Sequence, residues 1–183
     1  FIYFSSSYVY SGIDSNKMVG ESINLFPKHN FGLCKLFFEN LLQREHSNSI
    51  IFRLSSVFGN GESLHPNAIE MMSREAINEK LITVWGKGKR KMQYVYIEDV
   101  IKYLVTSPKL APGVYNLCGD DYQTIDETAK KIASYFNVDI KYLNKKEGET
   151  IPKLNNQKLV TSINGDLLSN IDSSLESFLS NIK

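Results

Sequence analysis

The sequence has few of the residues that mark disulfide frameworks or metal sites. Among its 183 residues there are two cysteines, Cys34 and Cys118, which lie far apart and form no Cys-x-x-Cys pair. The three histidines, His29, His46 and His65, show no metal-ligand spacing with them, so we expect no metal site. The two thiols predict buried cysteines in a reducing, cytoplasmic compartment.

Long apolar runs and charge of one sign are also lacking. No uninterrupted apolar stretch approaches the roughly 18 residues of a membrane-spanning helix, so no membrane association is expected. The chain has 21 Lys and Arg against 20 Asp and Glu, a net charge of +1, which makes nucleic acid a poor expectation for a partner. With 42% hydrophobic and 22% charged residues, the chain is typical of a globular protein with one core or two small ones.

The order of the expected elements favours an α/β fold. From residue 30 to 44, apolar residues recur at the helical period and predict an amphipathic helix that packs on a core; they are Cys34, Phe37, Phe38, Leu41 and Leu42. Further expected elements are a strand over 49–58, a helix over 67–79, strands over 81–85 and 139–143, and a helix over 97–106. Capping boxes at Thr124 to Glu127 and Ser173 to Glu176 predict two more helix starts.

The first residues combine a short apolar strand with a cluster of hydroxyls. Residues 1–12 run Phe-Ile-Tyr-Phe-Ser-Ser-Ser-Tyr-Val-Tyr-Ser-Gly. Such an arrangement presents hydroxyls at the carboxyl end of a strand, where ligands bind in open α/β sheets. On the helix that follows, Phe31 and Lys35 are one turn apart on the same face.

Taken with Glu21, Pro27, Lys35 and Glu39, this stretch resembles the extended short-chain dehydrogenase/reductase family, NAD(P)-dependent epimerases and dehydratases that act mainly on nucleotide sugars. The family pattern is roughly S-S-x-x-V-Y-G, an acidic residue, a proline, Y-G-x-S-K and a nearby glutamate. Three later segments resemble, in the same order, the R-x-x-N-V-Y-G, F-V-Y-V-D-D-V and G-V-Y-N motifs; they are residues 53–59, 94–100 and 113–117. The resemblance covers residues 1–136 well and the last 45 or so loosely.

The resemblance implies a two-part architecture. Residues 1–59 would be the C-terminal strands and helix of a Rossmann-like parallel sheet, and residues 60–183 a smaller α/β substrate-binding domain, with some elements returning to the sheet. It also implies that the chain begins well inside the dinucleotide-binding domain, with roughly the first two-fifths of an ordinary member missing. The helix over 31–44 often contributes to a dimer contact in this family, so a homodimer through it is expected.

The same resemblance assigns roles to individual residues. Ser6 falls on the catalytic Ser/Thr, and Ser7 is one register away. Lys35 falls on the lysine that holds the nicotinamide ribose and lowers the pKa of the catalytic tyrosine. Phe31 falls on that tyrosine. Phenylalanine has no proton to transfer, so a loss of several kcal/mol in transition-state stabilisation is the expected order of magnitude.

Other positions depart from the family pattern. Ser56 stands where many members have a substrate-binding asparagine, and Met92 where an arginine often pairs with the diphosphate. Methionine cannot pair with a phosphate. The basic run at 87–91 lies just before it, so Arg90 or Lys91 would supply the charge from a shifted register. The alternative is that this run, beside two glycines, is a solvated hairpin.

The glycine-rich dinucleotide loop of the family, Gly-x-x-Gly-x-x-Gly, is absent. Gly59-Asn-Gly61 and Gly86-Lys-Gly88 are isolated pairs, which are more typical of turns. NAD or NADP is therefore expected in the full-length parent and not necessarily in this chain.

Two hypotheses about function follow. In the first, the chain is a portion of an NAD(P)-dependent nucleotide-sugar epimerase, dehydratase or reductase and has little or no activity by itself. In the second, it is a binding or assembly module derived from that family. Fold resemblance does not separate them, because function resides in the site.

Overall fold

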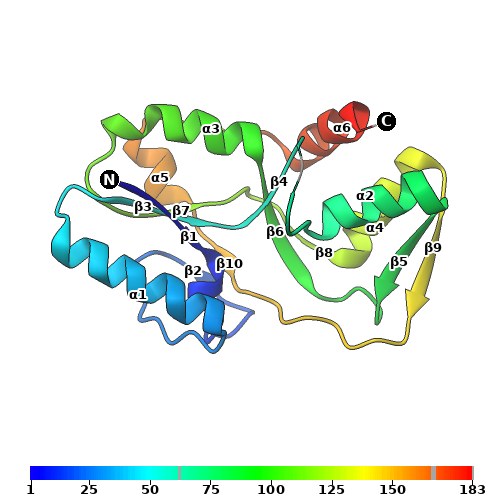
Figure 1. The fold of residues 1–183 in the computed structure, drawn as a ribbon, viewed down its shortest axis with the longest axis horizontal. Helices are drawn as coiled ribbons and strands as arrows, with labels where there is room; N and C mark the ends of the chain where they lie inside the picture. Colours follow the sequence, from blue (N-terminus) through cyan, green and yellow to red (C-terminus); the bar gives the residue numbers. More distant parts are fainter. Residues whose placement is uncertain (62, 166–167, 183) are drawn as a thin grey trace.

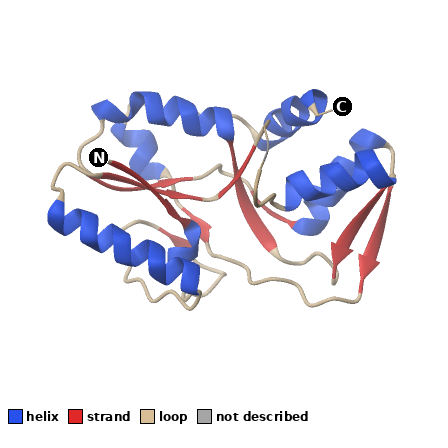
Figure 2. Ribbon diagram, viewed as in Figure 1, coloured by secondary structure: helices blue, strands red, loops and turns tan. Residues whose placement is uncertain are grey.

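A computed structural model describes residues 1–61, 63–165 and 168–182. These residues form two α/β lobes that lie side by side (Figure 1). Helices cover strands in both lobes (Figure 2), and most paired strands run parallel. The α/β fold class predicted from the sequence is confirmed. The division near Gly59 stays a prediction, because the chain passes between the lobes more than once.

The first lobe is built on a parallel sheet in the order β1-β3-β7. The register pairs Ser6 with Leu54 and Leu54 with Leu117, so the carboxyl ends of the three strands meet at one edge. Ligands of open α/β sheets bind at that edge. The strands are β1 (Ile2–Ser6), β3 (Ile50–Leu54) and β7 (Gly113–Leu117).

Helices cover both faces of this sheet. Helix α1 (Asn30–Glu45) lies on one face, and α3 (Ile97–Thr106) and α5 (Gln157–Ser162) lie on the other (Figure 1). The face under α3 and α5 holds an apolar core, whose buried members are Ile50, Phe52, Val95, Val100, Tyr103, Leu110, Tyr115, Leu117 and Leu159. Burial of this surface is the main stabilising term for the lobe.

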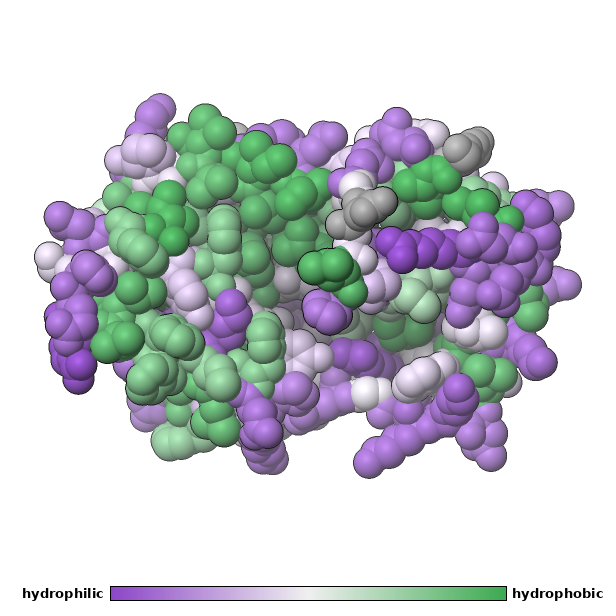
Figure 3. Space-filling view, in the orientation of Figure 1, coloured by the Kyte–Doolittle hydropathy of each residue, from purple (hydrophilic) through white to green (hydrophobic). Residues whose placement is uncertain are grey.

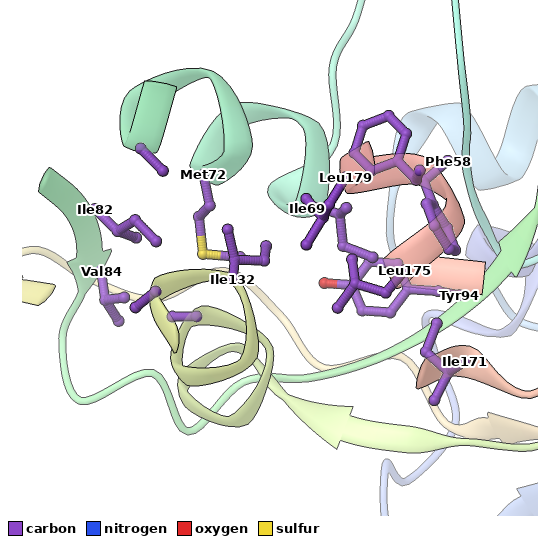
Figure 4. Close-up of a cluster of buried hydrophobic side chains, with 14 of the residues drawn as sticks. Phe58, Ile69, Met72, Ile82, Val84, Tyr94, Ile132, Ile171, Leu175 and Leu179 are labelled. Atoms are coloured by element: carbon purple, nitrogen blue, oxygen red, sulfur yellow. The ribbon is translucent and has the colours of Figure 1, made fainter. Parts of the chain in front are cut away.

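The second lobe pairs β5 (Leu81–Trp85) with β9 (Asp139–Leu143) in parallel. Helices α2 (Ala68–Glu79) and α4 (Ile125–Phe136) pack on them and on each other, and α6 (Ile171–Asn181) closes the cluster. In Figure 4, Met72 of α2 and Ile132 of α4 meet between the two helices, and Leu175 and Leu179 of α6 lie near Tyr94.

Two further small sheets are present. A sheet in the order β4-β6-β8 lies between the lobes, and a pair of short strands, β2 and β10, lies beneath the first lobe. We call residues 144–156 the strap, because this segment runs from the second lobe back to the first along the lower side of the molecule (Figure 1). The remaining elements are β2 (Met18–Val19), β4 (Ser56–Phe58), β6 (Lys91–Tyr96), β8 (Tyr122–Thr124), β10 (Lys153–Leu154) and the 3-10 turns η1 (Ser7–Tyr10) and η2 (Ser107–Lys109).

Most expected elements are present, with two corrections. The strand expected over 49–58 is interrupted at Ser55. Its backbone N–H still donates to the carbonyl of Leu117 in β7, but from Ser56 on the chain pairs with β6, so β3 and β4 belong to different sheets. The capping box at Thr124 is confirmed, but the one at Ser173 is wrong. Helix α6 begins at Ile171, because the Asn170 side chain caps it by accepting from the backbone N–H of Asp172.

The buried face expected for α1 is wrong. Phe37 is 62% exposed and Phe38 47%, and Cys34 is exposed as well. The helix instead buries Gly32 and Glu39. Apolar residues occur on most sides of this helix, so their period does not determine which face is buried. The buried face is determined by Ser5 and Arg53, which bond Glu39 under the helix.

The second cysteine, Cys118, is buried as expected, and burial raises the pKa of its thiol. No helix in the described ranges is long and apolar enough to cross a membrane. Within those same ranges, no three His, Cys, Asp or Glu side chains gather closely enough to share a metal ion.

Candidate functional site

A cleft of about 610 Å³ opens between the lobes at the carboxyl edge of the first sheet. It is lined by segments that are far apart in the sequence. Six of the seven predicted site residues lie in its wall: Ser6, Ser7, Phe31, Ser56, Arg90 and Lys91. The fold therefore brings together hydroxyl groups from two strand ends, a helix start and a basic turn.

The three serines at the end of β1 have different surroundings. Ser5 is 3% exposed and donates its hydroxyl to the Glu39 carboxylate behind the sheet. Ser6 and Ser7 are half-buried and line the cleft. The Ser6 hydroxyl accepts from the backbone N–H of Tyr8 at 3.3 Å and so caps η1. Alternation along the strand thus commits Ser5 to the interior, and both candidate serines face the ligand space.

Phe31 lies in the first turn of α1 with 48% of its surface exposed. Its ring meets the ring of Tyr8 edge-on, with centroids 5.9 Å apart, and both rings line the cleft. The helix approaches η1 this closely because position 32 is glycine. A Cβ at Gly32 would lie 2.2 Å from the Tyr8 carbonyl oxygen, so any other residue would push the first turn of α1 outward.

Lys35 is the predicted site residue that does not line the cleft. Its ammonium donates to the carbonyl oxygen of Phe4 at 2.8 Å and lies 5.6 Å from the centroid of the Phe31 ring. The one-turn spacing inferred from the sequence is therefore real, and the charge is next to the ring of Phe31, for which the family resemblance predicts a tyrosine. A phenol there would be adjacent to a fixed ammonium, which favours the phenolate.

Basic side chains also line the cleft. Its wall includes Arg90, Lys91 and His65, together with the half-buried Met92. No carboxylate occurs among the described residues that line the cleft. Gly86 and Gly88 adopt positive φ angles of 62° and 66°, so the basic run forms a turn. It is not the hairpin that one alternative held, because β5 pairs with β9 whereas β6 pairs with β4 and β8. The turn also places Arg90 and Lys91 in the cleft wall, as the other required.

A second, more apolar pocket of about 210 Å³ adjoins the cleft. The two share Ala68 and Arg90 in their walls. Trp85, 54% exposed, lies in the wall of the second pocket with Met71 and Val84. A long ligand could therefore pass from hydroxyl groups, across two cations, to an aromatic surface.

The strap closes one side of both pockets, and sequence reasoning missed it. Ile151 and Pro152 line the cleft, and Glu147 and Gly148 line the second pocket. Glu147 holds the strap on the basic turn by accepting backbone N–H groups of Arg90 at 2.6 Å and Lys87 at 2.9 Å. These bonds, chiefly that from Arg90, lower the pKa of Glu147. The sequence of the strap is polar and without period, so no pattern indicated this role.

Other wall residues were also missed. Tyr8 directly follows the serine cluster, and its adjacency was the one available signal. Asn67 caps α2, and its side-chain amide donates to the Val57 carbonyl at 2.6 Å. Gln93 alternates with Lys91 along β6 and bonds the backbone of Leu154 in both directions. Strand alternation from Lys91 could have indicated Gln93.

Comparisons with known proteins point to one family. The sequence model described as the NAD dependent epimerase/dehydratase family matches residues 1–118. A curated dTDP-D-glucose 4,6-dehydratase from Dictyostelium discoideum is 29% identical over an alignment 152 residues long, and the match covers 72% of this chain and 34% of that protein.

Solved structures share the fold at low sequence identity. UDP-glucuronic acid 4-epimerase from Bacillus cereus, in complex with UDP-glucuronic acid and NAD, superposes with a TM-score of 0.85 at 20% identity, over 100% of this chain and 62% of that one. UDP-glucose 4-epimerase from Thermus thermophilus, in complex with NAD, has a TM-score of 0.86 at 15% identity, over 98% and 62%. This chain thus spans about a third of the curated relative and about three fifths of these structures.

Proposed function

The chain belongs to the NAD dependent epimerase/dehydratase family, and from that premise we propose that it is the substrate-binding part of a nucleotide-sugar epimerase, dehydratase or reductase. The observation that carries the proposal is the cleft, whose wall combines serine hydroxyls with Arg90 and Lys91 and has no described carboxylate. Such a site suits a ligand that carries both hydroxyl groups and negative charge.

Each part of a nucleotide sugar has a matching surface. Ser6, Ser7 and Ser56 offer hydroxyls to the sugar ring, since a hydroxyl both donates and accepts. Arg90 and Lys91 would pair with the diphosphate, whose charge needs donors of this kind. The second pocket beside Trp85 would take the base, because aromatic faces stack on nucleobases.

The chemistry assigned to the chain's own residues is limited. Ser6 would orient the reacting oxygen of the sugar, and Lys35 would hold a ribose hydroxyl near the end of β1. A bound nicotinamide would supply the hydride acceptor. Phe31 holds no proton at the position where a tyrosine would transfer one. We therefore propose that this chain turns over substrate slowly or not at all.

The residues fit only one end of a dinucleotide. Lys35 would hold the nicotinamide ribose. For the pyrophosphate, a Gly-x-x-Gly-x-x-Gly turn is needed, and no such turn occurs within the 183 residues. NAD or NADP is accordingly proposed for a protein that also carries the remaining part of the dinucleotide-binding domain, in a cytoplasmic setting that suits the two free thiols.

A second function has one observation in its favour. Helix α1 exposes Phe37, Phe38 and Leu33, and apolar side chains gather over the part of the surface where α1 and α3 lie (Figure 3). An exposed apolar patch of this kind is typical of an association surface. A binding or assembly module that forms a homodimer through α1 would use this face and would not need a tyrosine at position 31.

Calorimetric titration with UDP-glucose and dTDP-glucose tests the first function. We expect measurable binding that weakens about tenfold to thirtyfold in Arg90→Met, the loss of one charge-assisted contact. Lys130→Met is the matched control, because Lys130 is exposed on α4, away from the cleft wall, and pairs with Asp126. Absence of binding, or equal weakening in both variants, would contradict the proposal.

The tyrosine position is tested by Phe31→Tyr in a protein that carries a complete dinucleotide-binding domain. We expect nicotinamide absorbance changes with a nucleotide sugar to rise at least about a hundredfold above the phenylalanine form. Binding of nucleotide sugar by both forms with turnover by neither would favour the module.

A further inference from the structure

The polar face of α1 rests on a buried ion pair. Glu39 is 1% exposed and Arg53 is 4% exposed. The guanidinium holds the carboxylate by two nitrogens, Nη2 at 2.7 Å from Oε2 and Nε at 3.1 Å from Oε1. The carboxylate also accepts the Ser5 hydroxyl. Glu39 of the helix is thus bonded to β1 and to β3 at once.

The network continues from Arg53 into the rest of the first lobe. Its Nη1 donates to the Tyr10 hydroxyl at 2.8 Å and to the Glu21 carbonyl at 3.1 Å. The Tyr10 hydroxyl donates to the Asn116 side chain at 2.7 Å. Burial raises the pKa of Tyr10 to about 12, although the neighbouring Arg53 acts to lower it, so this phenol stays protonated and keeps its donor role.

Two side chains of α1, one turn apart, are fastened to neighbouring residues of β1. Lys35 donates to the Phe4 carbonyl, and Glu39 accepts from Ser5. The next residue, Ser6, begins the cleft wall. The two bonds fix both the height and the rotation of α1 on the sheet, because the helix contributes few buried apolar side chains of its own on this face.

We propose that Glu39 and Arg53 are positioning residues, whose ion pair holds the first turn of α1, and with it Lys35 and position 31, against the hydroxyls of Ser6 and Ser7. Neither residue lines the cleft, so both act through others. The inference rests on the proposed function, since this alignment matters only where position 31 and the serines share a substrate.

The test places a phenol at position 31 and reports its environment. Phe31→Tyr adds one tyrosine to the ten of the chain, and the unaltered chain is the blank in a carbon-13 tyrosine NMR titration. With Lys35 held beside it, we expect the new phenol to titrate about one pH unit below its ordinary pKa near 10. Neither substrate nor cofactor is needed, so failure here is distinguishable from failure of the nucleotide-sugar proposal.

Glu39→Gln in the Phe31→Tyr chain distinguishes loss of helix alignment from loss of negative charge, because the two effects shift the pKa of the new phenol in opposite directions. Position 39 lies eight residues from 31, about 12 Å along the helix. Removing its negative charge acts through space to lower the pKa of the new phenol. Loss of alignment with Lys35 raises it. We expect a rise of about half a unit to one unit, which the charge alone cannot produce.

Asp99→Asn in the same background is the matched control. Asp99 is also 1% exposed and paired at 2.7 Å, with Lys102 on α3, so its loss disturbs folding without touching α1. We expect the phenol pKa to stay unchanged. Equal titration of the phenol in the Glu39→Gln and Asp99→Asn chains would overturn the proposal, and so would an ordinary pKa in Phe31→Tyr itself.

Arg53→Lys serves if Glu39→Gln does not fold. The charge is conserved but the two-nitrogen contact is lost, so any shift of the phenol pKa reports geometry. We expect a smaller rise in the same direction. An unchanged pKa in a folded Arg53→Lys chain would contradict the positioning role.

Discussion

Helices α1 and α4 contact their lobes in opposite ways. Helix α4 buries Ala129, Ile132 and Ala133 and begins with a capping box. Helix α1 buries a glycine and a glutamate, has no side-chain cap, and exposes its phenylalanines. Helix α4 is held mainly by buried apolar area, and α1 mainly by a few hydrogen bonds and an ion pair. Directed bonds fix orientation more narrowly than apolar area does, which suits a helix that carries site residues.

The largest effect is expected from breaking the polar contact of α1. Glu39→Leu leaves the Arg53 guanidinium buried without its partner, and we expect a loss of about 3 to 5 kcal/mol in the free energy of unfolding, measured by urea denaturation. Glu39→Leu with Arg53→Met should recover most of it, because an apolar pair replaces both charges. A double variant as unstable as the single one would show that the contact is not specific to the pair.

The apolar contact of α4 is expected to be next in size. Ile132 is fully buried between α4 and α2, and Ile132→Ala shortens the side chain and leaves a cavity there. We expect a loss of about 3 kcal/mol in urea denaturation. Ile101→Ala on the exposed side of α3 is the control, since Ile101 is half-exposed. A loss in Ile132→Ala no larger than in this control would mean that the second lobe unfolds before the measured transition.

The cap of α4 gives a smaller, pH-dependent effect. The backbone N–H and hydroxyl of Thr124 lower the pKa of Glu127 from its ordinary 4.5. A carboxyl group whose pKa is lower in the folded state than in the unfolded state stabilises the fold at pH values above its unfolded pKa. This stabilisation is lost as the pH falls through the folded pKa. Glu127→Gln should therefore cost about 0.5 kcal/mol at pH 7 and nothing once the pH lies below the folded pKa. A cost that does not change with pH would contradict the charge contribution of this cap.

The smallest effect on stability is expected on the exposed side of α1. Phe37→Ser with Phe38→Ser should change the free energy of unfolding by no more than about 0.5 kcal/mol, because Phe37 is largely exposed and Phe38 is half-exposed. If α1 forms a homodimer contact, sedimentation should show that this variant stays monomeric at concentrations where the unaltered chain associates. Equal association of both would place the contact elsewhere.

Local patterns predicted most of the fold. The helix starting at Ile125 follows its capping box, and α2 follows its apolar period. The capping pattern at Ser173 places the start of α6 too late, since Asn170 and Ser173 are both good caps and in the structure Asn170 accepts from the backbone N–H of Asp172. For the candidate site, motif spacing singled out Ser6, Phe31 and Arg90 or Lys91, all of which line the cleft, but the strap has no period to detect.

The sequence by itself determined the α/β class, the family and the phenylalanine at position 31, because these depend on residues close together along the chain. Only the tertiary structure decided which face of α1 is buried. That choice depends on Arg53 and Ser5, which lie on other strands and meet Glu39 only after the sheet has formed. It also decided which of three consecutive serines face the cleft, since Ser5 bonds Glu39 behind the sheet, whereas Ser6 ends β1 and Ser7 begins η1.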